Sequence, residues 1–119
     1  MVLNYAMLVF SGLFVGVAAS FTGLGGGFLM VPLLVALGYS AQKAVGTSFL
    51  AILIISASAV LSHSKFSNID YRVALALGVG GIIGAQIGPY LLEHVSTIHF
   101  KKIFALALLG LAGYLFFQK

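Results

Sequence analysis

The sequence predicts an all-α membrane protein: a polytopic helix bundle whose glycine-broken first hairpin is followed by three transmembrane helices. Composition is the first reason. Of the 119 residues, 61% are hydrophobic and 7% are charged, with a mean hydropathy of +1.17. Soluble domains carry about 25% charged residues. The second reason is spacing, because the few charges separate apolar blocks that approach the roughly 20 residues needed to cross a bilayer.

Composition also excludes several classes of function. The chain contains no cysteine, which removes disulfides, thiolate metal sites and cysteine nucleophiles. Its net charge of +4 forms no basic cluster, so we expect the lipid bilayer and not nucleic acid as its surroundings. The histidines and acids are too scattered for a metal site or for paired acid–base chemistry. We therefore expect no cofactor and no enzymatic activity.

Three apolar blocks in the second part of the chain predict crossing helices over residues 44–64, 73–92 and 103–118. The last block is slightly short, and we expect its flanking lysines to snorkel toward the interface. Asp70 precedes the second block and is well placed to cap that helix. His94 and His99 are expected in loops.

The first block differs because it runs without charge over residues 2–42, which is too long for one crossing at 1.5 Å per residue. We expect two arms, near Tyr5–Phe21 and Phe28–Leu37. The second arm would be roughly 15 Å long, which is half a bilayer. This predicts a re-entrant or broken hairpin; a strongly tilted pair of full crossings is the alternative.

The break lies at Gly23, Gly25, Gly26 and Gly27, followed by Pro32. Consecutive glycines unwind a helix, and unwound backbone at membrane depth survives only where protein covers it or it lines a cavity. Close helix packing by small residues is the alternative explanation. Three glycines in a row favour a functional loop whose bare N–H groups would bind an anion.

Gly46, Thr47 and Ser48 open the next helix and place two hydroxyl groups near its N-terminus. Ordinary capping or bonding to a backbone carbonyl would explain them equally well. Beside a glycine-rich break, Gly25, Gly26, Gly27, Thr47 and Ser48 become the candidate substrate-binding residues.

Two further features have structural or gating interpretations. Gly80, Gly84 and Gly88 recur every four residues, which predicts close packing against another helix, either the glycine hairpin or a symmetry mate. His63 ends a helix near Lys65; proton coupling is conceivable, but a solvated interfacial histidine is the favoured interpretation.

The six basic residues divide equally between alternating loops, with Lys43, Lys101 and Lys102 on one side and Lys65, Arg72 and Lys119 on the other. An excess of basic residues on the cytoplasmic side normally fixes orientation. The balance suggests a dual-topology protein that pairs as an antiparallel dimer, although short chains also balance by chance.

The order of these motifs resembles the TauE/SafE membrane permeases, the sulfite-exporter-like proteins. The resemblance covers about residues 8–115 and rests on the following pieces: Gly23-Leu-Gly-Gly-Gly-Phe28, Val31-Pro32, Gly38, Ala44-Val-Gly-Thr-Ser48, His63, Asn68-Ile-Asp-Tyr-Arg72, and Gly84-Ala85 through Gly88. Ser67 and Tyr71 depart mildly from the family, which usually has glycine and tryptophan there.

The resemblance implies export of small anions, typically sulfite or organosulfur compounds, across the cytoplasmic membrane. Family members usually contain two such modules, so this chain is expected to be one domain over residues 1–119, a half-size permease module. It would act as a homodimer or with a second permease half. A non-transporting membrane subunit or a fragment that assembles with a partner is the alternative.

Overall fold

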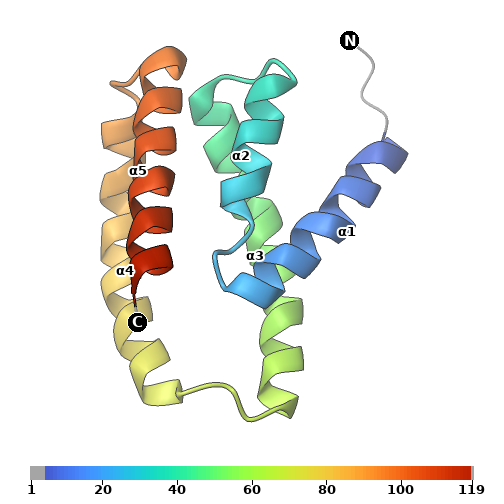
Figure 1. Cartoon of the computed structure of the whole chain (residues 1–119). Coiled ribbons are helices and arrows are strands. Elements are labelled where there is room, and N and C mark those ends of the chain that lie inside the picture. The colour runs from blue at the N-terminus through green and yellow to red at the C-terminus, as the bar shows by residue number, and fades with distance from the viewer. Residues whose placement is uncertain (1–4, 119) are drawn as a thin grey trace.

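The computed structural model describes residues 5–118, and all regular structure in this range is helical. The elements are α1 (Tyr5–Thr22), α2 (Gly27–Ala36), α3 (Ala41–Lys65), α4 (Tyr71–Leu92) and α5 (Thr97–Phe117) (Figure 1). In the described range, α1, α3, α4 and α5 are long and apolar enough to cross a membrane. The predicted fold class is confirmed.

The first hydrophobic block is a broken hairpin. Its arms, α1 and α2, lie within about a residue of the predicted arms. Helix α2 has only 10 residues, so it is about 15 Å long and cannot cross a bilayer. The hairpin is therefore one full-length arm and one half-length arm, and not a pair of full crossings.

The glycine loop packs tightly on α1 through Gly26, the N-cap of α2. Gly26 is buried and has a φ of 84°, which is left-handed backbone that favours glycine. A Cβ atom at this position would lie 2.9 Å from Cγ1 of Val15 and 3.4 Å from Cβ of Ala19. The absence of a side chain is what lets the loop approach α1 this closely.

The same loop faces the middle of α3. Cβ atoms built on Gly25 and Gly27 would lie 3.7 Å and 3.4 Å from the side chain of Ile52, which stands near the midpoint of this 25-residue helix. The loop thus lies part-way along the bundle, where α1 ends and α2 begins (Figure 1). This position matches the expected unwound backbone at membrane depth, covered by protein on two sides.

The N-terminal end of α3 is tied to the turn between α4 and α5. The side-chain amide of Gln42 donates to the carbonyl oxygens of Leu92 (3.0 Å) and Val95 (2.8 Å). The backbone N–H of Ala41 donates to Oγ1 of Thr97 at 3.1 Å. The Gln42 bonds engage the carbonyl of Leu92, the last residue of α4, and that of Val95 in the turn, and the Thr97 hydroxyl accepts a first-turn N–H of α3 that has no acceptor within its own helix.

Helix α5 begins at Thr97, six residues before the predicted 103, so the prediction of a short last helix was wrong. Ser96 is the cause, because its hydroxyl accepts the N–H of His99 at 3.3 Å and caps the first turn. His99 is therefore helical and not in a loop, and Lys101 and Lys102 lie inside the helix. The charges do not mark the helix boundary. The predicted cap of α4 is confirmed, since Oδ1 of Asp70 accepts the N–H of Val73 at 3.1 Å.

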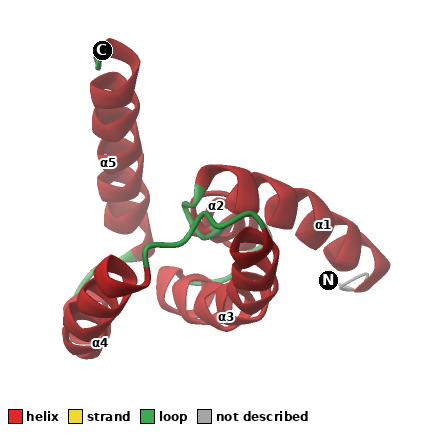
Figure 2. Cartoon of the chain, turned by 90° about the horizontal axis from the view of Figure 1, so that it is seen from below, coloured by secondary structure: helices red, strands yellow, loops and turns green. Residues whose placement is uncertain are grey.

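Helices α4 and α5 stand to one side of the group formed by α1, α2 and α3 (Figure 2). Neither of the two contains a buried residue. Cβ atoms built on Gly80, Gly84 and Gly88 would meet no atom within 4 Å. The close helix contact expected of this stripe is thus not made within the described residues 5–118, and the glycine hairpin is not its partner.

We predict that Gly26→Ala destabilises the protein more than Gly23→Ala does. Both positions have positive φ, so both substitutions carry the left-handed cost of about 1–2 kcal/mol. Only at Gly26 would the added Cβ atom also lie closer than 3 Å to another side chain, that of Val15. Such overpacking adds about 1–3 kcal/mol to the destabilisation. Unfolding of the two variants by denaturing detergent measures the difference, and equal midpoints would contradict the close approach.

We also predict that Gln42→Glu loosens the attachment of α3 to the α4–α5 turn. A carboxylate has nearly the same shape but cannot donate to the two carbonyl oxygens. Proteolysis in the α4–α5 turn should accelerate in this variant. Gln118→Glu, at the C-cap of α5, is the matched control; similar proteolysis of both variants would show that the two bonds do not hold the turn.

Candidate functional site

A cavity of about 480 Å³ lies between α1, α2 and α3, and we call it the Ser48 cavity. Its polar lining comes from Ser11 on α1, Tyr39 in the α2–α3 connection, and Lys43, Thr47 and Ser48 on α3. Val15, Met30 and other apolar side chains form the rest of the wall. A few polar groups in an apolar concavity are typical of a small-molecule site.

Ser48 is the distinctive residue of this cavity. It is 1% exposed, and its Oγ has no hydrogen-bond partner among the described residues. Helical serines commonly bond the carbonyl four residues earlier, and a buried polar group left unpaired costs about 1–3 kcal/mol. Ser48 is therefore a buried hydroxyl at the wall of the cavity whose hydrogen-bonding capacity is unused among the described residues.

The electrostatics of the Ser48 cavity favour an anion. Lys43 lies in the first turn of α3, where the helix dipole is already positive. A cation at this end is unfavourable for the helix alone by about 0.3–1 kcal/mol. Among the described residues no carboxylate forms an ion pair with Lys43, so its charge and the helix N-terminus add together at the cavity.

The glycine loop offers a second set of donors. The N–H groups of Gly25, Gly26, Gly27 and Phe28 have no hydrogen-bond acceptor among residues 5–118. However, Gly26 is buried against α1, and Gly25 lines a separate cavity of about 180 Å³ together with Gly23 and His63. The structure thus brings Thr47 and Ser48 into one cavity and places the glycine loop outside it.

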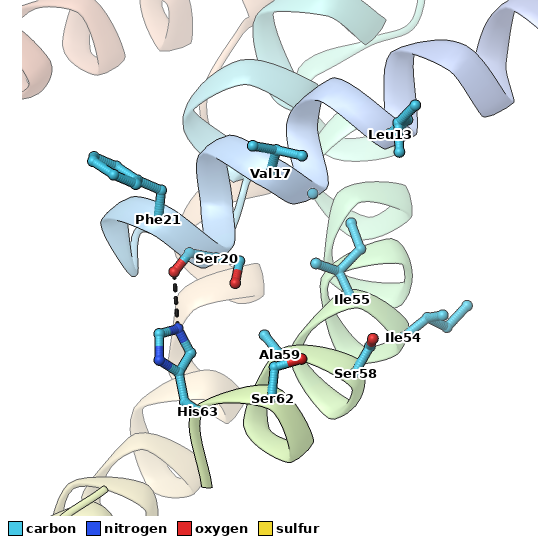
Figure 3. A pocket seen from close by; sticks show the side chains of 12 residues that line it. Leu13, Val17, Ser20, Phe21, Ile54, Ile55, Ser58, Ala59, Ser62 and His63 are labelled. Carbon is cyan, nitrogen blue, oxygen red and sulfur yellow. Dashed lines mark hydrogen bonds between the residues drawn. The ribbon is translucent and has the colours of Figure 1, made fainter. Parts of the chain in front are cut away.

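A third cavity, of about 700 Å³, lies between the C-terminal parts of α1 and α3, and we call it the His63 cavity (Figure 3). Its polar groups are Ser20 on α1 and Ser58, Ser62 and His63 on α3. Among the described residues, the hydroxyls of Ser20, Ser58 and Ser62 have no hydrogen-bond partner. Figure 3 shows these side chains around the space between the two helices.

His63 joins the ends of α1 and α3. Its Nε2 lies 3.0 Å from the carbonyl oxygen of Ser20, and its Nδ1 lies 3.1 Å from Nδ2 of Asn68. A carbonyl can only accept, so Nε2 carries the proton and Nδ1 accepts from the Asn68 amide. This is a neutral imidazole with both nitrogens engaged. His63 is half-buried, and the favoured interpretation of a merely solvated histidine was wrong.

The remaining predicted residues lie apart from these cavities. Pro32 borders a groove between α2 and α5. Gly46 faces Gly84 and Gly88 across another groove, between α3 and α4. Asp70 caps α4. A Cβ atom built on Gly80 would meet no other atom within 4 Å.

Ser11, Tyr39 and Lys43 also line the Ser48 cavity, and none of the three was predicted from the sequence to do so. In the sequence, Lys43 was interpreted only as a charge that marks the boundary of a helix. A signal was present for it, because Lys43 and Thr47 are four residues apart and share one face of a helix. No such signal existed for Ser11, since only the crossing of α1 over α3 brings it near.

The fold and its cavities define a class: an integral membrane protein with a broken helix at mid-depth and small polar cavities between its helices. Known proteins identify the family. The sulfite exporter TauE/SafE family matches residues 8–119, and the chain belongs to it. The predicted recognition is confirmed.

The relatives are described as probable membrane transporter proteins. YunE of Bacillus subtilis is 31% identical over 112 residues, which cover 87% of this chain and 41% of the relative. A protein of Methanocaldococcus jannaschii is 28% identical over 116 residues, covering 92% of this chain and 43% of the relative. The chain thus spans about two fifths of the length of these relatives. No solved structure matches it.

We predict that His63→Ala weakens the attachment of α1 to α3. The Ser20 carbonyl loses its donor, at a cost of about 1–3 kcal/mol. Ser64→Ala is the control, because the Ser64 hydroxyl bonds only within its own helix, to the carbonyl of Leu61. Unfolding midpoints in detergent measure both variants. Equal midpoints would show that the His63 bond does not stabilise the fold.

Proposed function

We propose that this chain is a half-size permease module that moves a small anion, such as sulfite or an organosulfur compound, across the cytoplasmic membrane. The observation that carries the proposal is the Ser48 hydroxyl, which is 1% exposed and unpartnered among the described residues. In a purely structural helix contact, alanine would be more stable at position 48 than serine, because burying an unpaired hydroxyl costs free energy.

The chemistry of the Ser48 cavity supports an oxyanion as the substrate. Hydroxyl groups of Thr47, Ser48 and Tyr39 donate hydrogen bonds, and Lys43 supplies a positive charge at the same end of α3. An anion with several oxygens would accept from these donors at once. Membership of the sulfite exporter family supports sulfur oxyanions in particular.

The proposal includes a partner, because one module leaves much of its surface open. Helix α4 has no buried residue, and its glycine stripe meets no atom within 4 Å. Small-residue stripes in membranes pack against a second helix. A second copy, in a homodimer that is antiparallel if the balanced charges permit both orientations, would supply that helix. A second permease half is the other source.

The alternative function is a non-transporting subunit that assembles with a partner half. The unpaired stripe of α4 favours it as much as it favours a transporting dimer. The Ser48 cavity favours the transporting module over the non-transporting subunit, because a subunit that binds no substrate would gain no hydrogen bond from the unpaired buried hydroxyl.

The test is Ser48→Ala in proteoliposomes that contain the purified chain and are loaded with sulfite. We expect flux to fall about 10-fold, the equivalent of one hydrogen bond to a charged group, while stability is unchanged or rises because an unpaired polar group is removed. Ser64→Ala, a serine outside the cavity, should leave both unchanged.

Flux that is unaffected by Ser48→Ala would remove this hydroxyl from the mechanism. A wild-type chain that assembles normally but moves no sulfite or sulfonate, alone or with a co-expressed permease half, would support the subunit.

A further inference from the structure

A groove of about 390 Å³ separates the half-length helix α2 from α5, and we call it the α2–α5 groove. Its apolar walls include Val31, Pro32 and Val35 on α2, and Phe100, Phe104 and Leu108 on α5. The three α5 residues recur every four positions and so share one face of that helix. Each of them is only half-buried, and α5 contains no buried residue. The packing of α5 against α2 is therefore incomplete.

The α2–α5 groove begins at the end of the bundle where α2 ends and α5 begins. The N–H of Ala41 donates to Oγ1 of Thr97 at 3.1 Å, which ties the start of α3, just after α2, to the start of α5. Figure 1 shows these helix ends at the same level. From Phe100 to Leu108, α5 advances about 12 Å along its axis. One leaflet of the hydrocarbon core is roughly 15 Å thick, which is half of the bilayer value. The groove therefore extends over most of the depth of one leaflet.

Lys101 lies at the shallow end of the α2–α5 groove. Among the described lining residues it alone is charged, and no carboxylate within residues 5–118 forms an ion pair with it. Lysine side chains lay their alkyl part along apolar surface and keep the ammonium group at the membrane interface. The neighbouring Lys102 lines none of the cavities and grooves described above. The groove thus combines one positive charge at the interface with apolar walls below it.

We propose that the α2–α5 groove binds an anionic phospholipid of the leaflet at this end of the bundle. The phosphate lies at Lys101, and one acyl chain lies along Phe100, Phe104 and Leu108. Charge complementarity selects the phosphate, and the apolar walls select the chain. This lipid site is separate from the proposed anion pathway, because the Ser48 cavity lies between α1, α2 and α3 and has no wall on α5.

The size of the groove argues against a helix of a partner protein as its occupant. A helix about 10 Å wide and about 12 Å long fills roughly 900 Å³ as a cylinder, which is more than twice the volume of the groove. The pairing proposed above for a second copy uses the glycine stripe of α4, which is a different surface. A single acyl chain is much thinner than a helix. Between α2 and α5 it would supply the van der Waals contacts that these two helices lack.

Native mass spectrometry of the purified chain in a neutral detergent tests the charged end of the site. Phosphatidylglycerol is the probe, and phosphatidylcholine with the same acyl chains is the comparison, because its choline cation offsets the charge of its phosphate. We expect phosphatidylglycerol to bind about 5-fold more tightly, the factor that corresponds to the attraction of one lysine to an anionic headgroup. Lys101→Gln should abolish this preference, whereas Lys102→Gln, the matched control, should keep it.

A second pair of variants tests the apolar part of the site. Ala105 lines the α2–α5 groove, and Ala107 on the same helix does not. Both alanines are exposed, so phenylalanine at either position displaces no buried side chain. Ala105→Phe should weaken the binding of both lipids, because its ring occupies the path of the acyl chain. Ala107→Phe should leave binding unchanged, and circular dichroism checks that both variants keep the helix content of the wild type.

Equal affinity for the two lipids, equal effects of the two lysine variants, or unchanged lipid binding in Ala105→Phe would each overturn the inference. Loss of a dimer in Ala105→Phe, with lipid binding intact, would overturn it as well and assign the groove to a second copy of the chain. No arm of this experiment measures flux, so the lipid site and the proposed transport activity can fail independently of each other.

Discussion

The arrangement of the first three helices depends on one close approach, that of the glycine loop to α1 and α3 at the middle of the bundle. Any side chain at Gly26 would overlap Val15, and the loop also rests on Ile52. Backbone that is not helical needs cover at membrane depth, and these two helices provide it. Helix α1 is inclined to α3 (Figure 1), and the Ser48 cavity and the His63 cavity lie between these two helices.

The glycine loop does not lie where the sequence led us to expect it, because it is outside the lining of the Ser48 cavity. The glycines were expected to bind the anion themselves together with Thr47 and Ser48. In the structure they pack against α1 and α3 outside the Ser48 cavity, and in the proposed function the hydroxyl groups lining that cavity would supply the donors. Of the loop residues, Gly23 and Gly25 line a smaller, separate cavity.

Burial is uneven, and this matters for assembly. Every buried residue among those described lies on α1, α2 or α3 or is Gly26 in the loop between α1 and α2, while the bonds of Gln42 and Ala41 tie α3 to the turn between α4 and α5. The chain belongs to the sulfite exporter TauE/SafE family and spans about two fifths of the length of the relatives it matches. Helix α4 has no buried residue, so the proposed pairing with a second copy or a second permease half would cover its open face.

The sequence by itself determined the helical membrane class, the break after α1, the half-length α2, the cap at Asp70 and the hydroxyl pair on α3. These follow from local quantities: apolar run length, glycine conformational freedom and capping chemistry. The start of α5 was missed because charges were taken as boundaries where Ser96 sets the cap. Only the tertiary structure decided that Ser48 is buried without a partner among the described residues, that Lys43 shares its cavity, and that Ser11 of α1 lines the same cavity. Each of these depends on how helices rotate and cross, and contacts between residues some 40 positions apart leave no periodic signal in one sequence.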